Sequence, residues 1–129
     1  MTPRIEGRSL GQFKETIHAY DCAAILFTLA ECSPCAEAKA LFADAMNLHL
    51  GSISHWIQVE LSPDPEDFAW LDHSFSLRVA PSFAVMLAGK VCGRRPGIRT
   101  KSGTLSALQL ESWITRRLNL PSGMVGDRP

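Results

Sequence analysis

The sequence has no excess of charge of either sign, because 13 Lys and Arg residues balance 13 Asp and Glu residues. A chain without net charge has no long-range electrostatic attraction to nucleic acid or to an anionic membrane surface. It also contains no internal repeat and no low-complexity tract. We therefore expect no nucleic acid and no membrane among its partners, and only local patches of charge can contribute to recognition.

Long apolar runs are absent as well. No stretch approaches the roughly 18 to 20 apolar residues that a bilayer-spanning helix needs, and residues 1–8 contain no apolar core of a secretory signal. The sequence thus predicts a cytoplasmic protein, and cytosolic thiols are normally kept reduced. Its four cysteines therefore suggest catalysis, metal binding or plain burial before a framework of structural disulfides.

The length and composition are those of one globular domain. The chain has 129 residues, of which 46% are hydrophobic and 20% charged, as is usual in globular proteins. We expect residues 1–9 to be a flexible N-terminal segment, residues 10–120 to form the domain, and residues 121–129 to be a flexible C-terminal tail. Ile5-Glu6-Gly7-Arg8 also matches a tetrapeptide that is engineered as a protease site, which leaves open whether residues 1–8 are native.

Helical and strand patterns alternate along the chain. Ser9 and Gln12 form a capping-box signature for a helix from Leu10 to about Tyr20. The apolar run from Ala23 to Leu29 predicts a strand that is buried on both faces. An alternation of this kind predicts an α/β fold with helices on both faces of a sheet. The expected elements are helices at 10–20, 33–50, 65–75 and 107–118, and strands at 23–29, 56–61, 82–87 and 91–94.

Cys32-Ser33-Pro34-Cys35 lies where the buried strand meets the next helix, and its chemistry has three interpretations. A zinc site would combine both cysteines with His49 and His55, which satisfy a Cys2His2 spacing rule. Zinc needs all its ligands within about 2.0 to 2.3 Å. A helix between Cys35 and His49 would separate them by roughly 21 Å, which excludes such a site.

The other two interpretations are a pair of small buried hydrophobic residues and a redox pair. Burial is a frequent fate of cysteine. A thiolate at a helix N-terminus, however, is stabilised by the helix dipole and by unsatisfied backbone amides, and two intervening residues let the second sulfur reach the first. The position of Cys32 and Cys35 at a strand-to-helix junction therefore favours the redox pair.

Four segments together resemble thioredoxin and related thiol-disulfide oxidoreductases, and the resemblance covers roughly residues 10–118. It implies an α/β thioredoxin-like fold, in which a central mixed β-sheet is flanked by helices on both faces. The four segments are the strand Ala24–Leu29, the turn Cys32-Ser33-Pro34-Cys35, the stretch Val79-Ala80-Pro81-Ser82-Phe83 and the helix start at Thr104–Leu110.

The resemblance also implies roles for single residues. Cys32 would be the attacking nucleophile and Cys35 the resolving thiol of a redox-active disulfide. Pro81 matches a proline that in this family has a cis peptide bond, faces the Cys pair and helps to dock extended substrate. Ala80, Ser33 and Pro34 are expected to bind substrate beside it. The resemblance implies no metal and no cofactor.

Two positions depart from the thioredoxin pattern. Thioredoxins have a tryptophan before the first cysteine and a buried acidic residue six positions before it, where this sequence has Glu31 and Leu26. Without the buried acid, proton transfer to and from Cys35 must use another group or water. We therefore expect slower reduction of disulfides than in thioredoxins. The effect of Glu31 stays open between a small destabilisation of the Cys32 thiolate and none at all.

The segment from Gly89 to Gly103 is several residues longer than in thioredoxins, and we expect a basic loop at 95–103 that overhangs the Cys pair. This loop either selects acidic partners or peptides or is only solvated surplus charge. Its basic residues, counted from the end of the preceding strand, are Arg94, Arg95, Arg99 and Lys101.

The expected function is thiol-disulfide exchange with protein or peptide disulfide substrates, as a reductase that an unknown electron donor regenerates. The alternative is a partner-binding or chaperone-like module with this fold, in which the Cys pair is dispensable. Leu26 and Glu31 favour the module, whereas the intact Cys pair and Pro81 favour the enzyme. Cys22 and Cys92 are expected to be buried, inert thiols.

Overall fold

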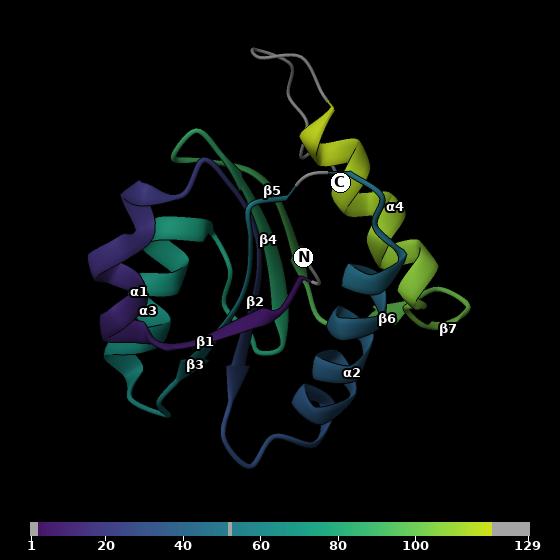
Figure 1. Ribbon diagram of the computed structural model, residues 1–129. Coiled ribbons are helices and arrows are strands. Elements are labelled where there is room, and N and C mark those ends of the chain that lie inside the picture. Colours follow the sequence, from purple (N-terminus) through teal and green to yellow (C-terminus); the bar gives the residue numbers. More distant parts are fainter. Residues whose placement is uncertain (1–2, 52, 120–129) are drawn as a thin grey trace.

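A five-stranded mixed sheet forms the centre of the protein, whose computed structural model describes residues 3–51 and 53–119 (Figure 1). The strand order is β1-β3-β2-β4-β5. β1 and β2 both run parallel to β3, whereas β4 is antiparallel to β2 and to β5. The predicted mixed sheet is therefore confirmed. The strands are β1 (Ile5–Ser9), β2 (Cys22–Leu29), β3 (His55–Leu61), β4 (Ser82–Leu87) and β5 (Lys90–Pro96).

Helices cover both faces of this sheet, as predicted. α1 and α3 lie against one face, and α2 and α4 lie against the other (Figure 1). None of the helices in the described residues has the length and apolar content that crossing a bilayer requires. The helices are α1 (Leu10–Thr16), which continues as the 3-10 turn η1 (Ile17–Ala19), α2 (Ser33–Leu48), α3 (Pro65–Phe75) and α4 (Ala107–Leu118).

β2 is the strand on which both halves of the core are built. Because successive side chains of a strand point to opposite faces, Ile25 and Phe27 enter the cluster formed with α1 and α3, while Ala24 and Leu26 enter the cluster formed with α2 and α4. All four side chains are 0% exposed. Full burial of a large apolar side chain stabilises the fold by about 1.5 to 3 kcal/mol. This double burial explains why the sequence of β2 is apolar without alternation.

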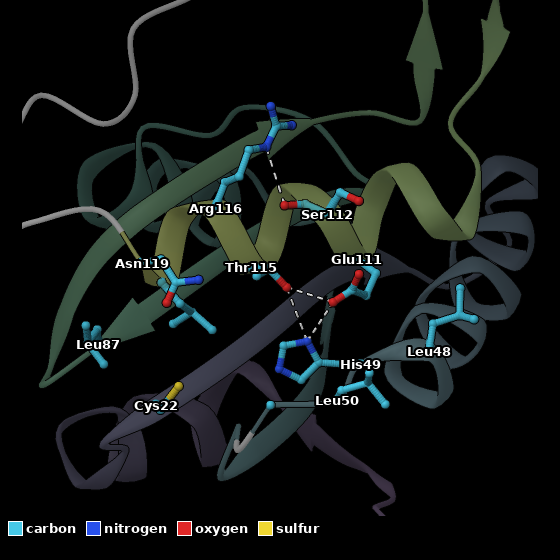
Figure 2. Close-up of a pocket in the computed structure, with 12 residues that line it drawn as sticks. Cys22, Leu48, His49, Leu50, Leu87, Glu111, Ser112, Thr115, Arg116 and Asn119 are labelled. Carbon is cyan, nitrogen blue, oxygen red and sulfur yellow. Dashed lines mark hydrogen bonds and ion pairs between the residues drawn. The ribbon is translucent and has the colours of Figure 1, made fainter.

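A partly buried polar contact joins the two helices on the α2 face of the sheet. His49, which follows the last residue of α2, places its Nδ1 2.9 Å from Oε2 of Glu111 on α4 (Figure 2). The hydroxyl of Thr115 donates to the same carboxylate oxygen at 2.7 Å. The hydrogen bond from Thr115 lowers the pKa of Glu111, and His49 lowers it further, against the opposing effect of partial burial. The contact therefore holds the end of α2 against α4 with an ionised carboxylate.

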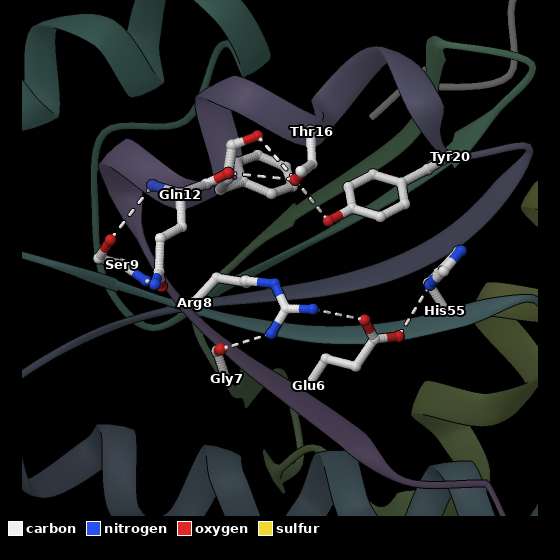
Figure 3. Close-up of polar contacts among 9 residues, drawn as sticks. Glu6, Gly7, Arg8, Ser9, Gln12, Thr16, Tyr20 and His55 are labelled. Atoms are coloured by element: carbon white, nitrogen blue, oxygen red, sulfur yellow. Dashed lines mark hydrogen bonds and ion pairs between the residues drawn. The ribbon is translucent and has the colours of Figure 1, made fainter.

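The N-terminal segment is ordered from residue 5, so the prediction of a flexible segment at 1–9 is wrong over residues 5–9. β1 pairs with β3 from Ile5 opposite Trp56 to Ser9 opposite Glu60. Glu6 bonds to Nδ1 of His55 at 2.8 Å and to the guanidinium of Arg8 at 2.9 Å (Figure 3). β1 is an edge strand whose stability comes from backbone pairing and polar contacts, so its sequence carries little apolar signal. The tail expected at 121–129 lies outside the described residues.

The prediction of a basic loop at 95–103 is also wrong, because most of this segment forms β-strands. β5 extends to Pro96, and β6 (Arg99–Thr100) pairs with β7 (Gly103–Thr104) in a small hairpin. Ile98 and Leu105 flank this hairpin, are 5% and 6% exposed, and anchor it to the core beside α2 and α4. Arg94 and Arg95 consequently belong to β5, so only Arg99 and Lys101 lie on the hairpin itself.

We predict that the Glu111→Gln substitution lowers the free energy of unfolding at pH 7 by about 1 to 2 kcal/mol, since a hydrogen-bonded charge is replaced by a neutral amide. A carboxylate whose pKa is depressed in the folded state stabilises the protein above its unfolded pKa, and this contribution disappears as the pH falls through the folded pKa. The difference between variant and wild type should therefore vanish well below the ordinary value of 4.5.

Urea unfolding at pH 7 and at pH 3 measures this difference. The matched control is Glu37→Gln, which changes an exposed carboxylate on α2 and should leave stability within about 0.5 kcal/mol of wild type. A loss in Glu111→Gln that is equally large at both pH values would contradict the role of the ionised carboxylate.

Candidate functional site

The Cys turn is positioned by the end of β2 and the start of α2. After Leu29 the chain reverses through Glu31, whose φ of 56° lies in the left-handed region. Cys32 then occupies the N-cap of α2, and its carbonyl oxygen accepts hydrogen bonds from the backbone N–H groups of Cys35 at 3.1 Å and of Ala36 at 3.4 Å. Pro34 lies in the first turn, where its missing N–H costs no helical hydrogen bond.

Cys32 and Cys35 are joined by a disulfide, with their Cα atoms 5.1 Å apart. The two residues differ in accessibility, because Cys35 is 1% exposed and Cys32 is partly exposed. The backbone N–H of Leu29 donates to Sγ of Cys35 at 3.3 Å. A donor aimed at this sulfur stabilises its thiolate when the disulfide is reduced. The sequence could not reveal this contact, since its donor is a backbone group.

Pro81 lies at the same end of the sheet as the Cys turn. Ser82 at the start of β4 pairs with Phe27 near the end of β2, so Pro81 comes just beyond the last pair of the ladder. The Ala80–Pro81 peptide bond is cis, as expected. The carbonyl of Pro81 accepts a hydrogen bond from the N–H of Gly97 at 2.9 Å, which ties the end of β5 to this loop.

The remaining predicted site residues lie around this end of the molecule. Ser33 and Pro34 are exposed on the first turn of α2, and Ala80 is half-buried. Val79 is 46% exposed, which is unusual for a large apolar side chain and adds an apolar surface that was not among the predicted site residues. Its apolar character is visible in the sequence, but only the structure shows that it is uncovered.

Comparison with solved structures decides the fold. A thioredoxin from Malassezia sympodialis matches over 91% of this chain and 95% of its own, with a TM-score of 0.61 and 19% identity. The short form of spinach chloroplast thioredoxin f matches over 92% of this chain and 96% of its own, with a TM-score of 0.59 and 18% identity. The chain has the thioredoxin fold.

A Schistosoma mansoni thioredoxin gives the same result, with a TM-score of 0.58 and 18% identity over 86% of this chain and 94% of its own. No protein-family model matches the chain, and no curated protein sequence matches it. The similarity therefore lies in the thioredoxin fold, and it extends across almost the whole length of both chains.

The interior is apolar at Leu26, the position where the thioredoxin pattern has a buried acid. Leu26 is 0% exposed and packs among the side chains of the α2 face. The nearest polar contact along β2 joins Thr28 to Gln58. The Gln58 amide donates a hydrogen bond to the buried Thr28 hydroxyl at 3.3 Å. Neither of these groups titrates near neutral pH. Glu31 is exposed to solvent, so its charge is screened by water.

The two histidines of the excluded Cys2His2 zinc pattern bond to other side chains. His49 bonds to Glu111 beyond the far end of α2, and His55 bonds to Glu6 on β1. Among residues 3–51 and 53–119, no group of three or more His, Cys, Asp or Glu side chains could hold a metal ion.

The prediction that Cys22 and Cys92 are buried is wrong, because both thiols are only partly buried. Cys22 begins β2, whereas Cys92 lies in β5 and packs against the core on the α2 face of the sheet. Partial burial raises the pKa of Cys22, the charge of Asp21 raises it further, and a backbone hydrogen bond from Ser54 opposes both. A raised pKa keeps the Cys22 thiol protonated and slow to react at neutral pH.

We predict that Cys32 of the reduced protein reacts with iodoacetamide at least about tenfold faster than Cys35, because alkylation requires an accessible thiolate. Short alkylation pulses followed by peptide mass mapping measure both rates in one sample. The oxidised protein is the control, in which neither cysteine should react. Equal rates for Cys32 and Cys35 would contradict the asymmetry of the site.

Proposed function

We propose that the protein is a thiol-disulfide oxidoreductase that reduces disulfides of protein or peptide substrates through Cys32 and Cys35. The observation that carries this proposal is the Cys32–Cys35 disulfide at the N-terminus of α2, with Cys32 partly exposed and Cys35 buried. The thioredoxin fold supports it, although a fold by itself hosts more than one function.

In the proposed reaction the Cys32 thiolate attacks one sulfur of a substrate disulfide. A bond forms between Sγ of Cys32 and that sulfur, the substrate S–S bond breaks, and the other substrate sulfur leaves as a thiolate that takes a proton from water. The Cys35 thiolate then attacks Sγ of Cys32, which closes the Cys32–Cys35 disulfide and releases the second substrate thiolate. Two electrons thereby pass from the protein dithiol to the substrate.

The residues around the pair have complementary roles in this proposal. The backbone amides at the start of α2 stabilise the Cys32 thiolate, and the N–H of Leu29 stabilises the Cys35 thiolate. Pro81, Ala80, Ser33 and Pro34 dock an extended substrate segment beside the disulfide. Proton transfer at Cys35 uses water, since Leu26 supplies no carboxyl group.

The cellular setting belongs to the same proposal. We place the protein in the cytoplasm, where a protein reductase of unknown identity returns two electrons and two protons to the Cys32–Cys35 disulfide. No cofactor takes part in the exchange, because the electrons move between sulfur atoms directly.

A second candidate function is a partner-binding or chaperone-like module in which the Cys pair is dispensable. The fully buried Leu26 favours it, because this position in the interior is apolar where thioredoxins have an acid. The two candidates differ in whether Cys32 is required, so one substitution separates them.

We predict that Cys32→Ser lowers the rate of reduction of insulin disulfides by at least about a hundredfold, since no other thiol is placed to attack. Cys35→Ser should instead accumulate a mixed disulfide through Cys32, which non-reducing mass spectrometry detects. The wild-type rate is expected to be lower than that of a thioredoxin measured in parallel.

The controls are Cys22→Ser and Cys92→Ser, which should retain the wild-type rate. An equilibrium titration of the wild type in glutathione buffers, followed by alkylation and mass mapping, should show one two-electron transition confined to Cys32 and Cys35. Thiols that never pair, or a Cys32→Ser protein with unchanged cellular function, would favour the binding module.

We further propose that the preferred clients are acidic near their disulfide. Arg99 and Lys101 are exposed on the β6–β7 hairpin, which begins where β5 ends beside the Pro81 loop. Arg95 helps to hold this hairpin, because its guanidinium donates to the carbonyl of Arg99 at 3.4 Å. The two exposed charges can therefore attract an acidic segment toward the Cys end of the sheet.

We predict that replacing both Arg99 and Lys101 by Gln slows reduction of an acidic peptide disulfide by about two- to fivefold at low salt, while a neutral peptide is unaffected. The difference should disappear at about 0.5 M salt, because the Debye length is then a few ångströms. Lys90→Gln, at the opposite end of β5, is the matched control. An unchanged preference for the acidic peptide would remove the role of the hairpin.

A further inference from the structure

A pocket of about 730 Å³ lies at the end of the molecule opposite the disulfide. We call it the distal pocket; it is formed where α2 ends, β2 begins and the last turns of α4 pass over both (Figure 2). Its volume falls within the range of about 300 to 1,000 Å³ that is typical of ligand sites. The lining residues that matter here are Leu48, His49, Leu50, Gly51, Leu87 and Glu111.

The distal pocket is separate from the proposed redox site. α2 begins at Ser33 beside Cys32 and ends at Leu48, and a helix of this length spans about 24 Å. β2 likewise begins with Cys22 at the pocket and ends with Leu29 at the Cys turn. An occupant of the pocket therefore does not touch the disulfide, and the inference does not depend on the proposed activity.

Three polar side chains, those of His49, Glu111 and Thr115, form the floor of the distal pocket, and hydrogen bonds hold them in one orientation. Nδ1 of His49 lies 2.9 Å from the Glu111 carboxylate, which Thr115 also bonds at 2.7 Å. The His49 and Glu111 side chains are only 7% and 17% exposed. A carboxylate at Nδ1 selects the tautomer whose proton is on Nδ1, and in that tautomer Nε2 has a lone pair that accepts hydrogen bonds.

Nε2 of His49 is uncovered on the pocket side. It has no hydrogen-bond partner among residues 3–51 and 53–119. A Cβ placed on Gly51 would lie 2.7 Å from this nitrogen, so the absence of a side chain at Gly51 keeps it open. Figure 2 shows the ring directing Nε2 away from Glu111, toward the side of the pocket where Cys22 lies.

The rim of the distal pocket is apolar and exposed. Leu48, Leu50 and Leu87 are 47%, 99% and 41% exposed, and they are three of the five large hydrophobic residues described as exposed. The rim comes from three places in the chain, the end of α2, the segment after it and the end of β4. Three apolar side chains around one polar floor are typical of a site for a ligand that has an apolar body and a polar end.

The charges around the floor favour a positive polar end. The pKa of Glu111 is lowered, so its carboxylate is ionised at neutral pH. The C-terminal turn of α4 also lines the pocket, and the carbonyl groups of a helix C-terminus carry partial negative charge. This turn has two cations, Arg116 and Arg117, of which only Arg116 lines the pocket. Figure 2 shows the Arg116 guanidinium directed away from His49, and its Nε donates to the Ser112 carbonyl at 3.4 Å.

We propose that the distal pocket binds an alkylammonium group. The ammonium donates a hydrogen bond to Nε2 of His49, whose Nδ1 is bonded to the Glu111 carboxylate on the other side of the ring, while the alkyl chain lies along Leu48, Leu50 and Leu87. A free alkylamine and the lysine side chain of a peptide share this chemistry, and either can be the source.

The test uses the full chain with n-hexylamine as the probe, followed by two-dimensional NMR of the backbone amides. Saturable shifts confined to the distal pocket support the proposal, and n-hexanol and hexanoate at the same concentrations should bind at least about tenfold more weakly, since they lack the positive charge. Equal binding of hexanoate would overturn the charge assignment, and shifts scattered over the surface would overturn the site.

Two variants locate the contact. Gly51→Ala, which covers Nε2, should weaken hexylamine binding by about fivefold or more, and Leu50→Ser should weaken it by about threefold. Leu108→Ser is the matched control, because Leu108 is 64% exposed on α4 and is not among the lining residues. Since Leu50 is almost fully exposed, its variant remains informative even if Gly51→Ala disturbs the loop. Unchanged affinity in both variants would overturn the proposal.

A short acetylated peptide with one lysine between two leucines distinguishes the sources. If it displaces hexylamine, a lysine of a protein partner is the source; if only hexylamine binds, the source is a small amine, and both results keep the alkylammonium assignment. Cys32→Ser protein should bind hexylamine with wild-type affinity, so a failure of the redox proposal would not be mistaken for a failure of this one.

Discussion

The burial of β2 on both faces is the constraint on which the rest of the structure depends. The side chains of Ala24 and Leu26 meet α2 and α4, and those of Ile25 and Phe27 meet α1 and α3, so a single strand belongs to both halves of the core. Its pairing with β3 on one side and β4 on the other fixes the end of the strand relative to Pro81. β2 ends at Leu29, only a few residues before Cys32. The position of the strand therefore fixes the position of the Cys turn.

The same constraint explains which features could be predicted from the sequence. A strand buried on both faces must be apolar throughout, and a helix start needs a side-chain cap, so β2 and the capping boxes at Ser9 and Ser106 were recognisable. β1 and the β6–β7 hairpin were missed because they lie at the edge of the fold, where backbone pairing and a few anchors such as Ile98 suffice. Solvent exposure follows from the packing of distant segments, so the partial exposure of Cys22 and of Val79 could not be predicted.

Leu26 shows how a site can change while the fold persists. An aliphatic side chain at this position gains stability from burial, whereas a carboxyl group there would lose hydration and raise its own pKa. Leu26 strengthens the packing of the α2 face, but its side chain has no group that can transfer a proton. Burial therefore favours an apolar residue here, and thioredoxins of known structure have the same fold at only 12 to 19% sequence identity to this chain.

α2 links the two ends of the molecule and gives them opposite electrostatic character. Its N-terminal amides face the Cys pair, where negative charge develops when a thiolate forms, and its C-terminus leads to His49, beside the Glu111 carboxylate. The dipole of a helix acts within its first and last turns, and a charge at one end is separated from the other by about 24 Å, well beyond the Debye length of about 8 Å at physiological salt. Charge at the distal pocket therefore cannot shift the reactivity of Cys32 directly. The two ends could influence each other only if α2 moved as a unit against β2, and the close packing of Ala38, Phe42 and Ala45 on that strand opposes such a movement.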